Sequence, residues 1–152
     1  MVNGGRLVDA TILKRDPAEV RPRQVISPAT SRQMRTLLRK VVTDGTGSKA
    51  DAVGYRVGGK TGTAEKSVRG GYSRKALLSS FIATFPTDDP AYILFVMLDE
   101  PKGIPETYGF ATAGWTAAPL AHDLIERVAP MLGVLPRDET DETIQQALLT
   151  LP

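Results

Sequence analysis

Apolar residues recur at steps of three and four between Ser27 and Gly45, a period that predicts an amphipathic helix. The segment opens with Ser27 and Pro28, a side-chain cap followed by a proline at the first helical position. Gly45 and Gly47 are expected to end it, because glycine readily adopts the conformation that closes helices. The predicted apolar face consists of Met34, Leu37, Leu38, Val41 and Val42.

Three strand-sized segments follow, joined by short polar links. The strands are expected at residues 55–65, 76–85 and 92–99, with a turn over 67–75 and a tight connection over 86–90. Because parallel strands need a long crossover, these short links predict an antiparallel meander. The third strand is apolar at nearly every position, which is typical of burial on both faces and predicts helices on each side of the sheet.

The two ends of the chain have weaker patterns. Residues 2–25 predict extended or looped chain that packs on another part of the molecule, and residues 133–152 predict an acidic tail with one short helix over 141–149. Residues 113–132 predict a second helix, so the expected class is α+β, a meander of about three strands carrying packed helices. The apolar side of this helix would hold Trp115, Ala118, Leu120, Leu124, Ile125 and Val128.

Composition and charge exclude several classes of protein. A hydrophobic content of 41% and a charged content of 24% are ordinary for a globular protein, so disorder is not expected. The formal net charge is only +2, and no nucleic-acid partner is expected. The one basic cluster falls opposite the apolar positions of the first helix, which predicts a solvated helix face: Arg32, Arg35, Arg39 and Lys40.

The sequence offers little for metal binding or membrane insertion. It has no cysteine and only one histidine, His122, so neither a metal site nor a cofactor is expected, and the histidine should pack or cap a helix. No segment approaches the ~20 apolar residues of a membrane span. An export signal or membrane anchor is therefore expected only outside these residues.

Two interpretations compete for residues 54–63. The first is a phosphate loop, because the segment satisfies the pattern of Gly, four residues and Gly-Lys-Thr, and residues 93–99 with Glu100 resemble an apolar strand ending in a magnesium-binding acid. A phosphate loop must lead into a helix, whose free amides bind the phosphates. No helical period appears between Gly62 and Lys75, so a nucleotide hydrolase is disfavoured.

The second interpretation places Lys60, Thr61 and Gly62 on a strand that lines a site. Lysine supplies a positive point charge, and the threonine hydroxyl can donate a hydrogen bond to a substrate carboxylate. Gly62 would let an extended substrate backbone approach the strand closely. Such residues position a substrate rather than attack it, and an exposed edge strand with an incidental lysine remains an alternative on the tripeptide alone.

The segment from Val57 to Lys66, Val-Gly-Gly-Lys-Thr-Gly-Thr-Ala-Glu-Lys, resembles the third motif of class B penicillin-binding proteins. These are the peptidoglycan transpeptidases of cell division and elongation. The resemblance spans residues 2–130, includes the Asp-Glu-Pro-Lys run from Asp99 to Lys102, and fits the division-type subgroup best. It implies a partial penicillin-binding/β-lactamase-like fold, with residues 1–132 as the C-terminal portion of a transpeptidase domain.

The family works by acyl transfer. A serine in a Ser-x-x-Lys motif attacks the D-Ala-D-Ala end of a stem peptide, and a second strand releases the acyl group by forming a cross-link. β-Lactams acylate the same serine. By family position, Lys60, Thr61, Gly62 and Thr63 are implied to hold the carboxylate of the stem peptide or β-lactam, on the periplasmic face of the inner membrane.

Two catalytic motifs of this family are absent from the sequence. No serine has a lysine three residues later, and Asn3, the only asparagine, cannot complete a Ser-x-Asn motif. The resemblance therefore implies that nucleophile and base lie in polypeptide outside this sequence, and that the chain alone is inactive. A non-catalytic binding or scaffold module remains the other function. The free edge of the third strand is expected to promote self-association.

Overall fold

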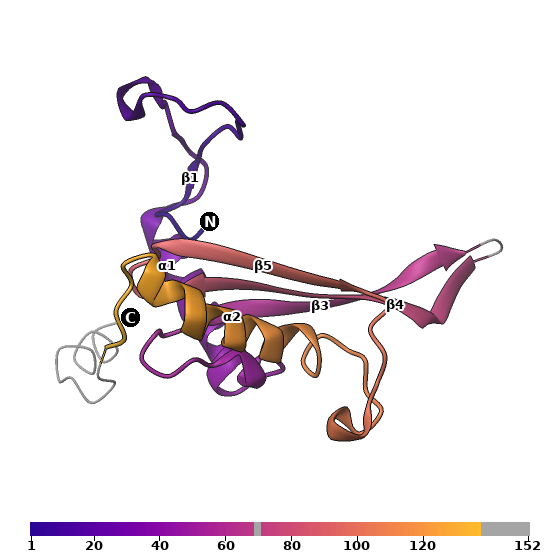
Figure 1. Cartoon of the computed structure of the whole chain (residues 1–152). Helices are drawn as coiled ribbons and strands as arrows, with labels where there is room; N and C mark the ends of the chain where they lie inside the picture. The colour runs from indigo at the N-terminus through magenta and orange to yellow at the C-terminus, as the bar shows by residue number, and fades with distance from the viewer. Residues whose placement is uncertain (69–70, 138–152) are drawn as a thin grey trace.

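The computed structural model describes residues 1–68 and 71–137 (Figure 1). Its sheet has the strand order β3-β4-β5, and both neighbouring pairs are antiparallel. The predicted α+β class and the three-stranded meander are therefore confirmed. The main elements are α1 (Pro28–Thr43), β3 (Gly58–Val68), β4 (Gly71–Phe85), β5 (Tyr92–Asp99) and α2 (Ala117–Met131).

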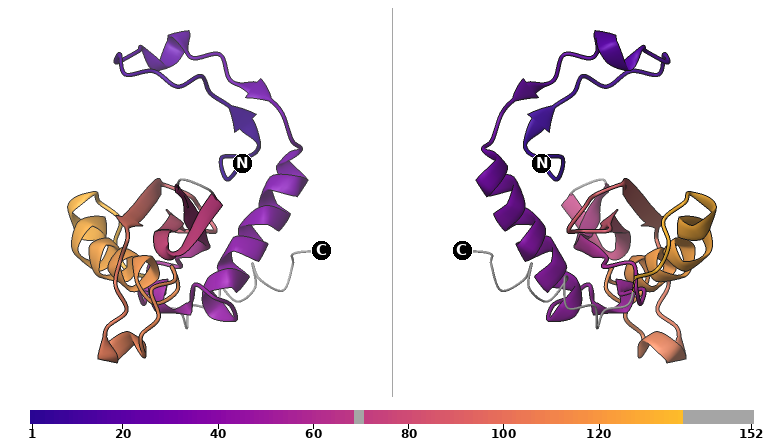
Figure 2. Two further views of the ribbon diagram at one scale, coloured as in Figure 1. Left: turned by 90° about the vertical axis from the view of Figure 1, so that its right-hand side faces the viewer. Right: turned by 90° about the vertical axis from the view of Figure 1, so that its left-hand side faces the viewer.

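An N-terminal arm extends away from the sheet and helices in the views of Figures 1 and 2. It contains a short antiparallel pair, β1 (Arg6–Leu7) with β2 (Arg23–Gln24), and the single turn η1 (Pro17–Glu19). The predicted extended chain is confirmed, but its packing is not, because nearly all of its described side chains are exposed. Ser31 holds the start of the arm by donating from its hydroxyl to the carbonyl of Met1 at 2.6 Å.

Helix α1 begins as the sequence predicts. The Ser27 hydroxyl accepts a hydrogen bond from the Thr30 amide at 3.0 Å, and Pro28 is the first helical residue. The predicted apolar face is correct except at Leu37, whose side chain is 55% exposed. The helix lies beside β3, while α2 lies on the side of β4 and β5 (Figure 2).

The predicted solvated face of α1 is correct for Arg32 and Lys40, which are exposed, but wrong for Arg35 and Arg39, which are partly buried. The Arg39 guanidinium donates to both carboxylate oxygens of Asp51, at 2.6 and 3.3 Å, and to the carbonyl oxygen of Val57 at 2.7 Å. Arg35 donates to the carbonyl oxygen of Asp88 at 2.7 Å. These bonds tie the helix to the segments before β3 and after β4.

The hairpin of β3 and β4 is longer than predicted. The strands continue to Val68 and from Gly71, so most of the predicted turn over 67–75 is strand, with a register shift at Glu65 and Lys66. The hairpin projects beyond the helices (Figure 1). Strand β3 also begins later than predicted, because Arg56 adopts a positive φ of 47° that interrupts extended chain.

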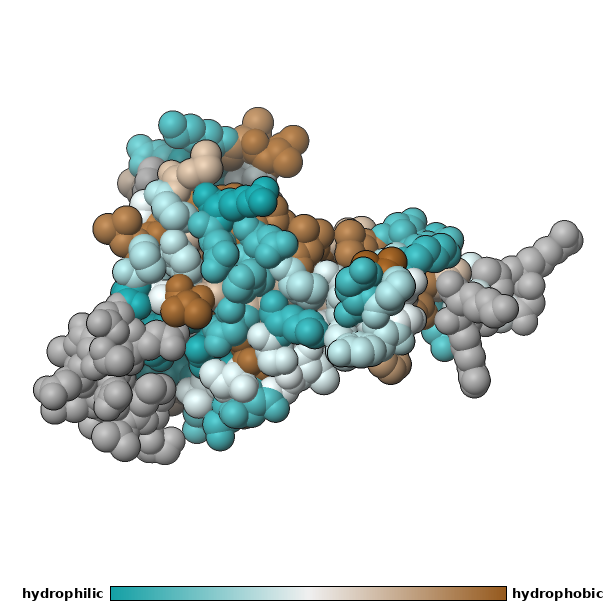
Figure 3. All heavy atoms as spheres, turned by 60° about the horizontal axis from the view of Figure 1, so that its bottom comes forward, coloured by the Kyte–Doolittle hydropathy of each residue, from teal (hydrophilic) through white to brown (hydrophobic). Residues whose placement is uncertain are grey.

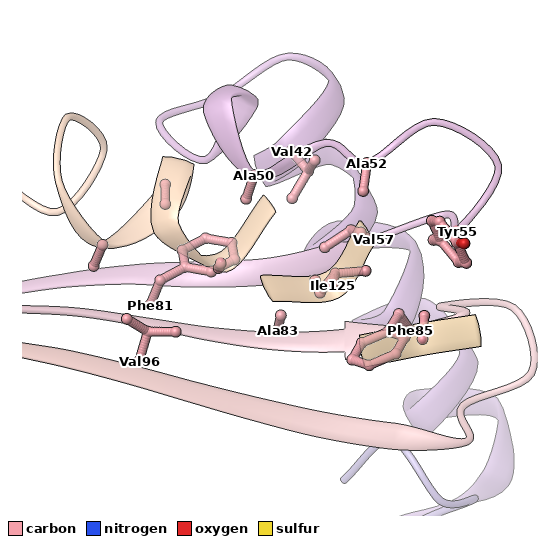
Figure 4. Packing of buried hydrophobic residues seen from close by; sticks show 14 of the residues in the cluster. Val42, Ala50, Ala52, Tyr55, Val57, Phe81, Ala83, Phe85, Val96 and Ile125 are labelled. Atoms are coloured by element: carbon pink, nitrogen blue, oxygen red, sulfur yellow. The ribbon is translucent and has the colours of Figure 1, made fainter. Parts of the chain in front are cut away.

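The core lies between one face of the sheet and the helices (Figure 4). Phe81 and Ala83 of β4 and Val96 of β5 supply the sheet side. Val42 of α1 and Ile125 of α2 pack into the same cluster and are fully buried. Burying these side chains gives the fold its main stabilisation, at about 25 cal/mol per Å² of apolar surface.

Helix α2 begins at Ala117 rather than at residue 113, and Pro119 lies in its first turn, where the missing amide costs least. Trp115 therefore precedes the helix and is not part of its apolar side. After α2, the amide of Arg137 donates to the carbonyl of Gly54 at 2.9 Å, which attaches residues 133–137 to the loop before β3. The helix predicted over 141–149 lies outside the described residues.

Strand β5 is buried on one face only, so the prediction of burial on both faces is wrong. Val96 is buried, and Leu94 and Leu98 pack against the same core. Ile93, Phe95 and Met97 point to the other face and are 61%, 59% and 58% exposed. The described helices leave this face uncovered near β5.

The surface of the protein is otherwise mixed. The view in Figure 3 shows mainly hydrophilic side chains, with hydrophobic ones in separate small patches. No described helix is long and apolar enough to cross a membrane.

Candidate substrate-binding site

Residues Lys60, Thr61, Gly62 and Thr63 lie within β3, an edge strand of the sheet. The segment is extended and does not open a helix, so the phosphate-loop interpretation of residues 54–63 is wrong. Because side chains alternate along a strand, Thr61 and Thr63 share one face, and Lys60 and Gly62 share the other. The structure thus divides the four predicted residues between the two faces of the sheet.

Thr61 and Thr63 line a pocket of ≈ 320 Å³ beside β3. Two further segments complete its wall: the turn after α1, which contributes Thr46 and Lys49, and the loop before α2, which contributes Trp115. The sequence pattern gave no sign that these three residues belong to a site. They lie far from the Lys-Thr-Gly motif along the chain and come close only through the packing of both helices on the sheet.

The threonine hydroxyls of the pocket have fixed partners. Thr61 Oγ1 lies 2.8 Å from Thr46 Oγ1, and Thr63 Oγ1 accepts a hydrogen bond from the amide of Ala113 at 3.0 Å. A hydroxyl that accepts from an amide keeps its own proton for donation. Thr63 can therefore donate to an acceptor in the pocket, such as a carboxylate or a carbonyl oxygen.

Two lysines place positive charge near these hydroxyls. The Lys60 ammonium donates to the carbonyl oxygen of Thr61 at 2.7 Å and lies 3.5 Å from Thr61 Oγ1. Although the Lys60 side chain leaves the strand on the opposite face, its charged end reaches the threonine. Lys49 Nζ lies 4.5 Å from the ring centre of Trp115. This arrangement favours an anionic ligand.

An aromatic cluster borders the pocket. Trp115 stacks on Phe110 with ring centres 5.6 Å apart, and Tyr108 meets Trp115 edge-on at 5.5 Å. Tyr108 and Phe110 are largely exposed, although aromatic side chains usually gain by burial. The cluster offers an apolar surface next to the polar threonines, so the pocket suits a ligand with both a charged and an apolar part.

A side chain added at Gly62 would meet one side-chain atom of the neighbouring strand. A Cβ atom at this position would lie 2.7 Å from Ser80 Oγ on β4. That hydroxyl donates to the carbonyl of Gly62 at 3.3 Å. The close approach of a substrate backbone at Gly62, expected from the sequence, stays a prediction.

His122 has the packing role that the sequence predicts. Its Nδ1 lies 2.8 Å from the carbonyl oxygen of Asp51, and its Nε2 lies 3.5 Å from a carboxylate oxygen of Glu126. Among residues 1–68 and 71–137, no group of three acidic or histidine side chains is placed to hold a metal ion.

Comparison with known proteins gives the class. A family model described as the penicillin binding protein transpeptidase domain matches residues 1–126. The fold is similar to the transpeptidase domain of penicillin-binding protein 3 from Burkholderia pseudomallei, with a TM-score of 0.76 and 35% identity, over 90% of this chain and 40% of that one. The fold and the Lys-Thr-Gly edge strand are thus those of a penicillin-binding transpeptidase domain.

Curated relatives give the particular family. The chain is 46% identical over 151 residues to "Probable peptidoglycan D,D-transpeptidase FtsI" of Caulobacter vibrioides, covering 91% of this chain and 25% of that protein. It is 42% identical over 147 residues to stage V sporulation protein D of Bacillus subtilis, covering 90% of this chain and 22% of that protein. The chain belongs to the class B penicillin-binding protein transpeptidases, and it spans about a quarter of the length of these relatives.

Proposed function

We propose that this chain forms the substrate-binding wall of a peptidoglycan D,D-transpeptidase, and that the acylated serine comes from polypeptide outside these 152 residues. The observation that carries the proposal is that Thr61 and Thr63 line one pocket and that the Lys60 ammonium lies 3.5 Å from Thr61 Oγ1. In this proposal residues 1–132 are the C-terminal portion of the transpeptidase domain, and residues 133–152 are its tail.

The substrate end would bind through charge and hydrogen bonds. The C-terminal carboxylate of a stem peptide accepts from the Thr61 and Thr63 hydroxyls and is neutralised by the Lys60 ammonium. Hydrogen bonds to a charged partner are about twice as strong as neutral ones. The free edge of β3 can pair with the extended stem peptide, because an edge strand leaves backbone amides and carbonyls available.

This binding would place the D-Ala-D-Ala amide for acyl transfer. The serine oxygen forms a bond to the carbonyl carbon, the carbon–nitrogen bond breaks, and the terminal D-Ala leaves with a proton on its amine. The amino group of a second stem peptide then displaces the serine, which recovers its proton. Backbone amides near Thr63 would border the oxyanion that forms in each step.

β-Lactams carry a carboxylate beside a reactive amide and would use the same contacts. Penicillin-binding protein 3 of Mycobacterium tuberculosis, solved in complex with ampicillin, resembles this chain with a TM-score of 0.68 and 27% identity. The match covers 84% of this chain and 29% of the Mycobacterium tuberculosis chain. It supports a β-lactam as a ligand of the intact enzyme, which we place on the periplasmic face of the inner membrane through an anchor outside these residues.

A non-catalytic binding module is the second candidate. The observation that favours it is a formed pocket in a sequence without Ser-x-x-Lys or Ser-x-Asn. In this case the chain alone would bind a stem peptide or a β-lactam reversibly. A binding module and the wall of a transpeptidase site would make the same contacts with the ligand. The two functions differ in whether a serine from another part of the polypeptide completes the site.

The first test uses the chain alone. After incubation with a β-lactam, intact-mass measurement is expected to show only the unmodified chain, because the sequence has no Ser-x-x-Lys motif to supply an activated serine. A stoichiometric adduct would overturn the proposal. Titration of a D-Ala-D-Ala peptide followed by NMR is expected to shift the amide signals of Thr61 and Thr63.

Variants separate the site from the rest of the chain. Thr61→Val is expected to weaken peptide binding about tenfold, the loss of one charge-assisted hydrogen bond. Thr36→Val on α1, remote from the pocket, is the matched control and should bind like the wild type. Equal binding by Thr61→Val and wild type would show that the carboxylate does not bind at this strand. The same substitution in an enzyme that contains the serine should lower kcat/KM by a similar factor.

A further inference from the structure

The hydroxyl of Thr46 meets the hydroxyl of Thr61 at the wall of the pocket. Thr46 lies in the turn after α1, and its Oγ1 is 2.8 Å from Thr61 Oγ1 on β3, a normal distance for a hydrogen bond between hydroxyls. Among the described residues, the other polar side chain at Thr61 Oγ1 is the Lys60 ammonium, at 3.5 Å. Thr46 thus makes the shorter of the two contacts to this hydroxyl of the candidate site.

The direction of this hydrogen bond decides what Thr61 can offer to a ligand. A hydroxyl donates one hydrogen bond and accepts up to two, whereas an ammonium only donates. When Thr46 donates, Thr61 accepts from Thr46 and Lys60 and keeps its own proton for the pocket. When Thr61 donates to Thr46 instead, its proton is no longer available to a ligand. A carboxylate only accepts, so it binds Thr61 in the first arrangement.

Thr63 has the same arrangement with a backbone donor. Its Oγ1 accepts from the amide of Ala113 at 3.0 Å, and an amide cannot reverse the direction of that bond. Both β3 hydroxyls that line the pocket are therefore contacted by a group from a neighbouring segment. The contact to Thr61 comes from a side chain, so a substitution can remove it without changing the backbone.

The turn that carries Thr46 is held by close backbone packing. The amide of Gly47 donates to the carbonyl of Val41 near the end of α1, at 2.9 Å. A Cβ atom at Gly114 would lie 2.6 Å from the carbonyl oxygen of Thr46, so the loop before α2 packs directly on this residue. Thr46 is itself exposed and is not part of the apolar core. The backbone thus positions its hydroxyl, and the core does not depend on its side chain.

We propose that Thr46 is a positioning residue of the substrate site and acts through Thr61. Its hydroxyl donates to Thr61 Oγ1, and Thr61 then donates to the terminal carboxylate of the stem peptide. Hydrogen bonds in such a chain polarise one another, which strengthens the bond from Thr61 to the charged acceptor. The inference rests on the proposed function, because it takes this carboxylate as the ligand of Thr61.

The test compares two peptides that differ only at the C-terminus. One is a D-Ala-D-Ala peptide with a free carboxylate, and the other ends in a carboxamide, which both donates and accepts. In NMR titrations the wild-type chain should bind the carboxylate peptide more tightly. Thr46→Val removes the hydroxyl at similar side-chain size. It should weaken binding of the carboxylate peptide about fivefold and binding of the carboxamide peptide by less than about twofold.

Control variants separate positioning from a structural effect. Thr46→Ser keeps the hydroxyl and should bind both peptides like the wild type. Thr43→Val removes an exposed hydroxyl that lies 2.9 Å from a carboxylate oxygen of Asp44 and does not line the pocket, and it should also bind like the wild type. Circular dichroism verifies the fold, and Thr46→Ala is the second deletion if Thr46→Val does not fold. An equal loss for both peptides would show a structural role and overturn the proposal.

A double variant shows whether Thr46 acts through Thr61. In a chain that carries Thr61→Val, the further change Thr46→Val should not alter binding of the carboxylate peptide, because the hydroxyl that Thr46 orients is already absent. Additive losses would mean that Thr46 contacts the ligand independently of Thr61, and they would overturn the proposal.

The titrations also separate this inference from the proposed function. A wild-type chain that binds the two peptides equally, or binds neither, would overturn the proposed carboxylate site and the role of Thr46 together. A wild-type chain that prefers the carboxylate peptide, with a Thr46→Val variant that keeps the same preference, would overturn the role of Thr46 alone.

Discussion

Thr63 of β3 and Ala113 of the loop before α2 are joined by a hydrogen bond of 3.0 Å, from the Ala113 amide to the Thr63 hydroxyl. They are fifty residues apart in sequence. Ala113 is fully buried, so its amide has no access to bulk water as an alternative acceptor. The bond thus fixes the loop that carries Trp115 and at the same time orients a hydroxyl of the pocket.

Thr63→Val is expected to destabilise the fold by about 1–3 kcal/mol, because it leaves the buried amide of Ala113 without an acceptor. Thr63→Ser keeps the hydroxyl and should lose much less. The free energy of unfolding from urea denaturation distinguishes the two variants. Equal losses for Val and Ser would mean that this bond contributes nothing to stability.

Gly59 and Gly62 should differ sharply in their tolerance of alanine. A Cβ at Gly59 would lie 2.4 Å from the carbonyl oxygen of Ile82 and 2.5 Å from the ring of Phe81. The backbone cannot yield and Phe81 is fully buried, so Gly59→Ala should cost about 3 kcal/mol.

At Gly62 the nearest atom to a new Cβ is the Ser80 hydroxyl, which can rotate away. Gly62→Ala should therefore cost less than about 1 kcal/mol. Thermal denaturation of the two variants provides the comparison. A Gly59→Ala variant that melts at the wild-type temperature would contradict the close contact between Gly59 and the Phe81 ring.

Arg39→Met should destabilise the protein by about 2 kcal/mol, because it removes the partner of Asp51 and of the Val57 carbonyl. The loss is smaller than for a fully buried ion pair, since the Asp51 side chain is 34% exposed. Arg32→Met, at an exposed position of the same helix, is the matched control and should stay within about 0.5 kcal/mol of wild type. Urea denaturation of both variants measures the difference, and equal stabilities would contradict the prediction.

The pKa of Lys66 should exceed its ordinary value, because the carboxylates of Asp99 and Glu100 each lie 2.9 Å from its ammonium. A pKa raised in the folded state stabilises the fold below the pKa of an unfolded lysine, about 10.4. That stabilisation is lost as the pH rises through the folded pKa.

NMR titration of the lysine side-chain carbons measures the Lys66 pKa directly. Lys66→Met should lower the melting temperature at pH 8. The difference in melting temperature from wild type should shrink as the pH rises above the pKa of an unfolded lysine. Lys40→Met, at an exposed position of α1, provides the control. A Lys66 pKa at or below that of a free lysine would contradict the pairing.

The sheet and helices were predictable because local rules decide them. The Ser27 cap, the spacing of Leu38, Val41 and Val42, and the short links between strands all follow from sequence. The extent of the β3–β4 hairpin did not follow. Its outer part is held by pairing such as Ser67 with Tyr72, and backbone pairing leaves no hydrophobic period to detect.

The uniformly apolar β5 shows the limit of pattern reasoning about burial. Its composition is that of a central strand, yet burial depends on what lies beside it, and no described element pairs with its outer edge. The residues of the site also fall into those that the sequence reveals and those that it does not. The Lys60 to Thr63 motif is local and was found, whereas Thr46, Lys49 and Trp115 join it through tertiary packing.

Trp115 is the only tryptophan of the chain, and its indole lies on the wall of the pocket between Phe110 and Lys49. Its ultraviolet emission therefore reports on this one place in the molecule. A compound that enters beside Thr61 and Thr63 would displace solvent from the indole. The wavelength and the intensity of the tryptophan emission would then change. The protein thus carries its own optical reporter of occupancy, with no dye attached.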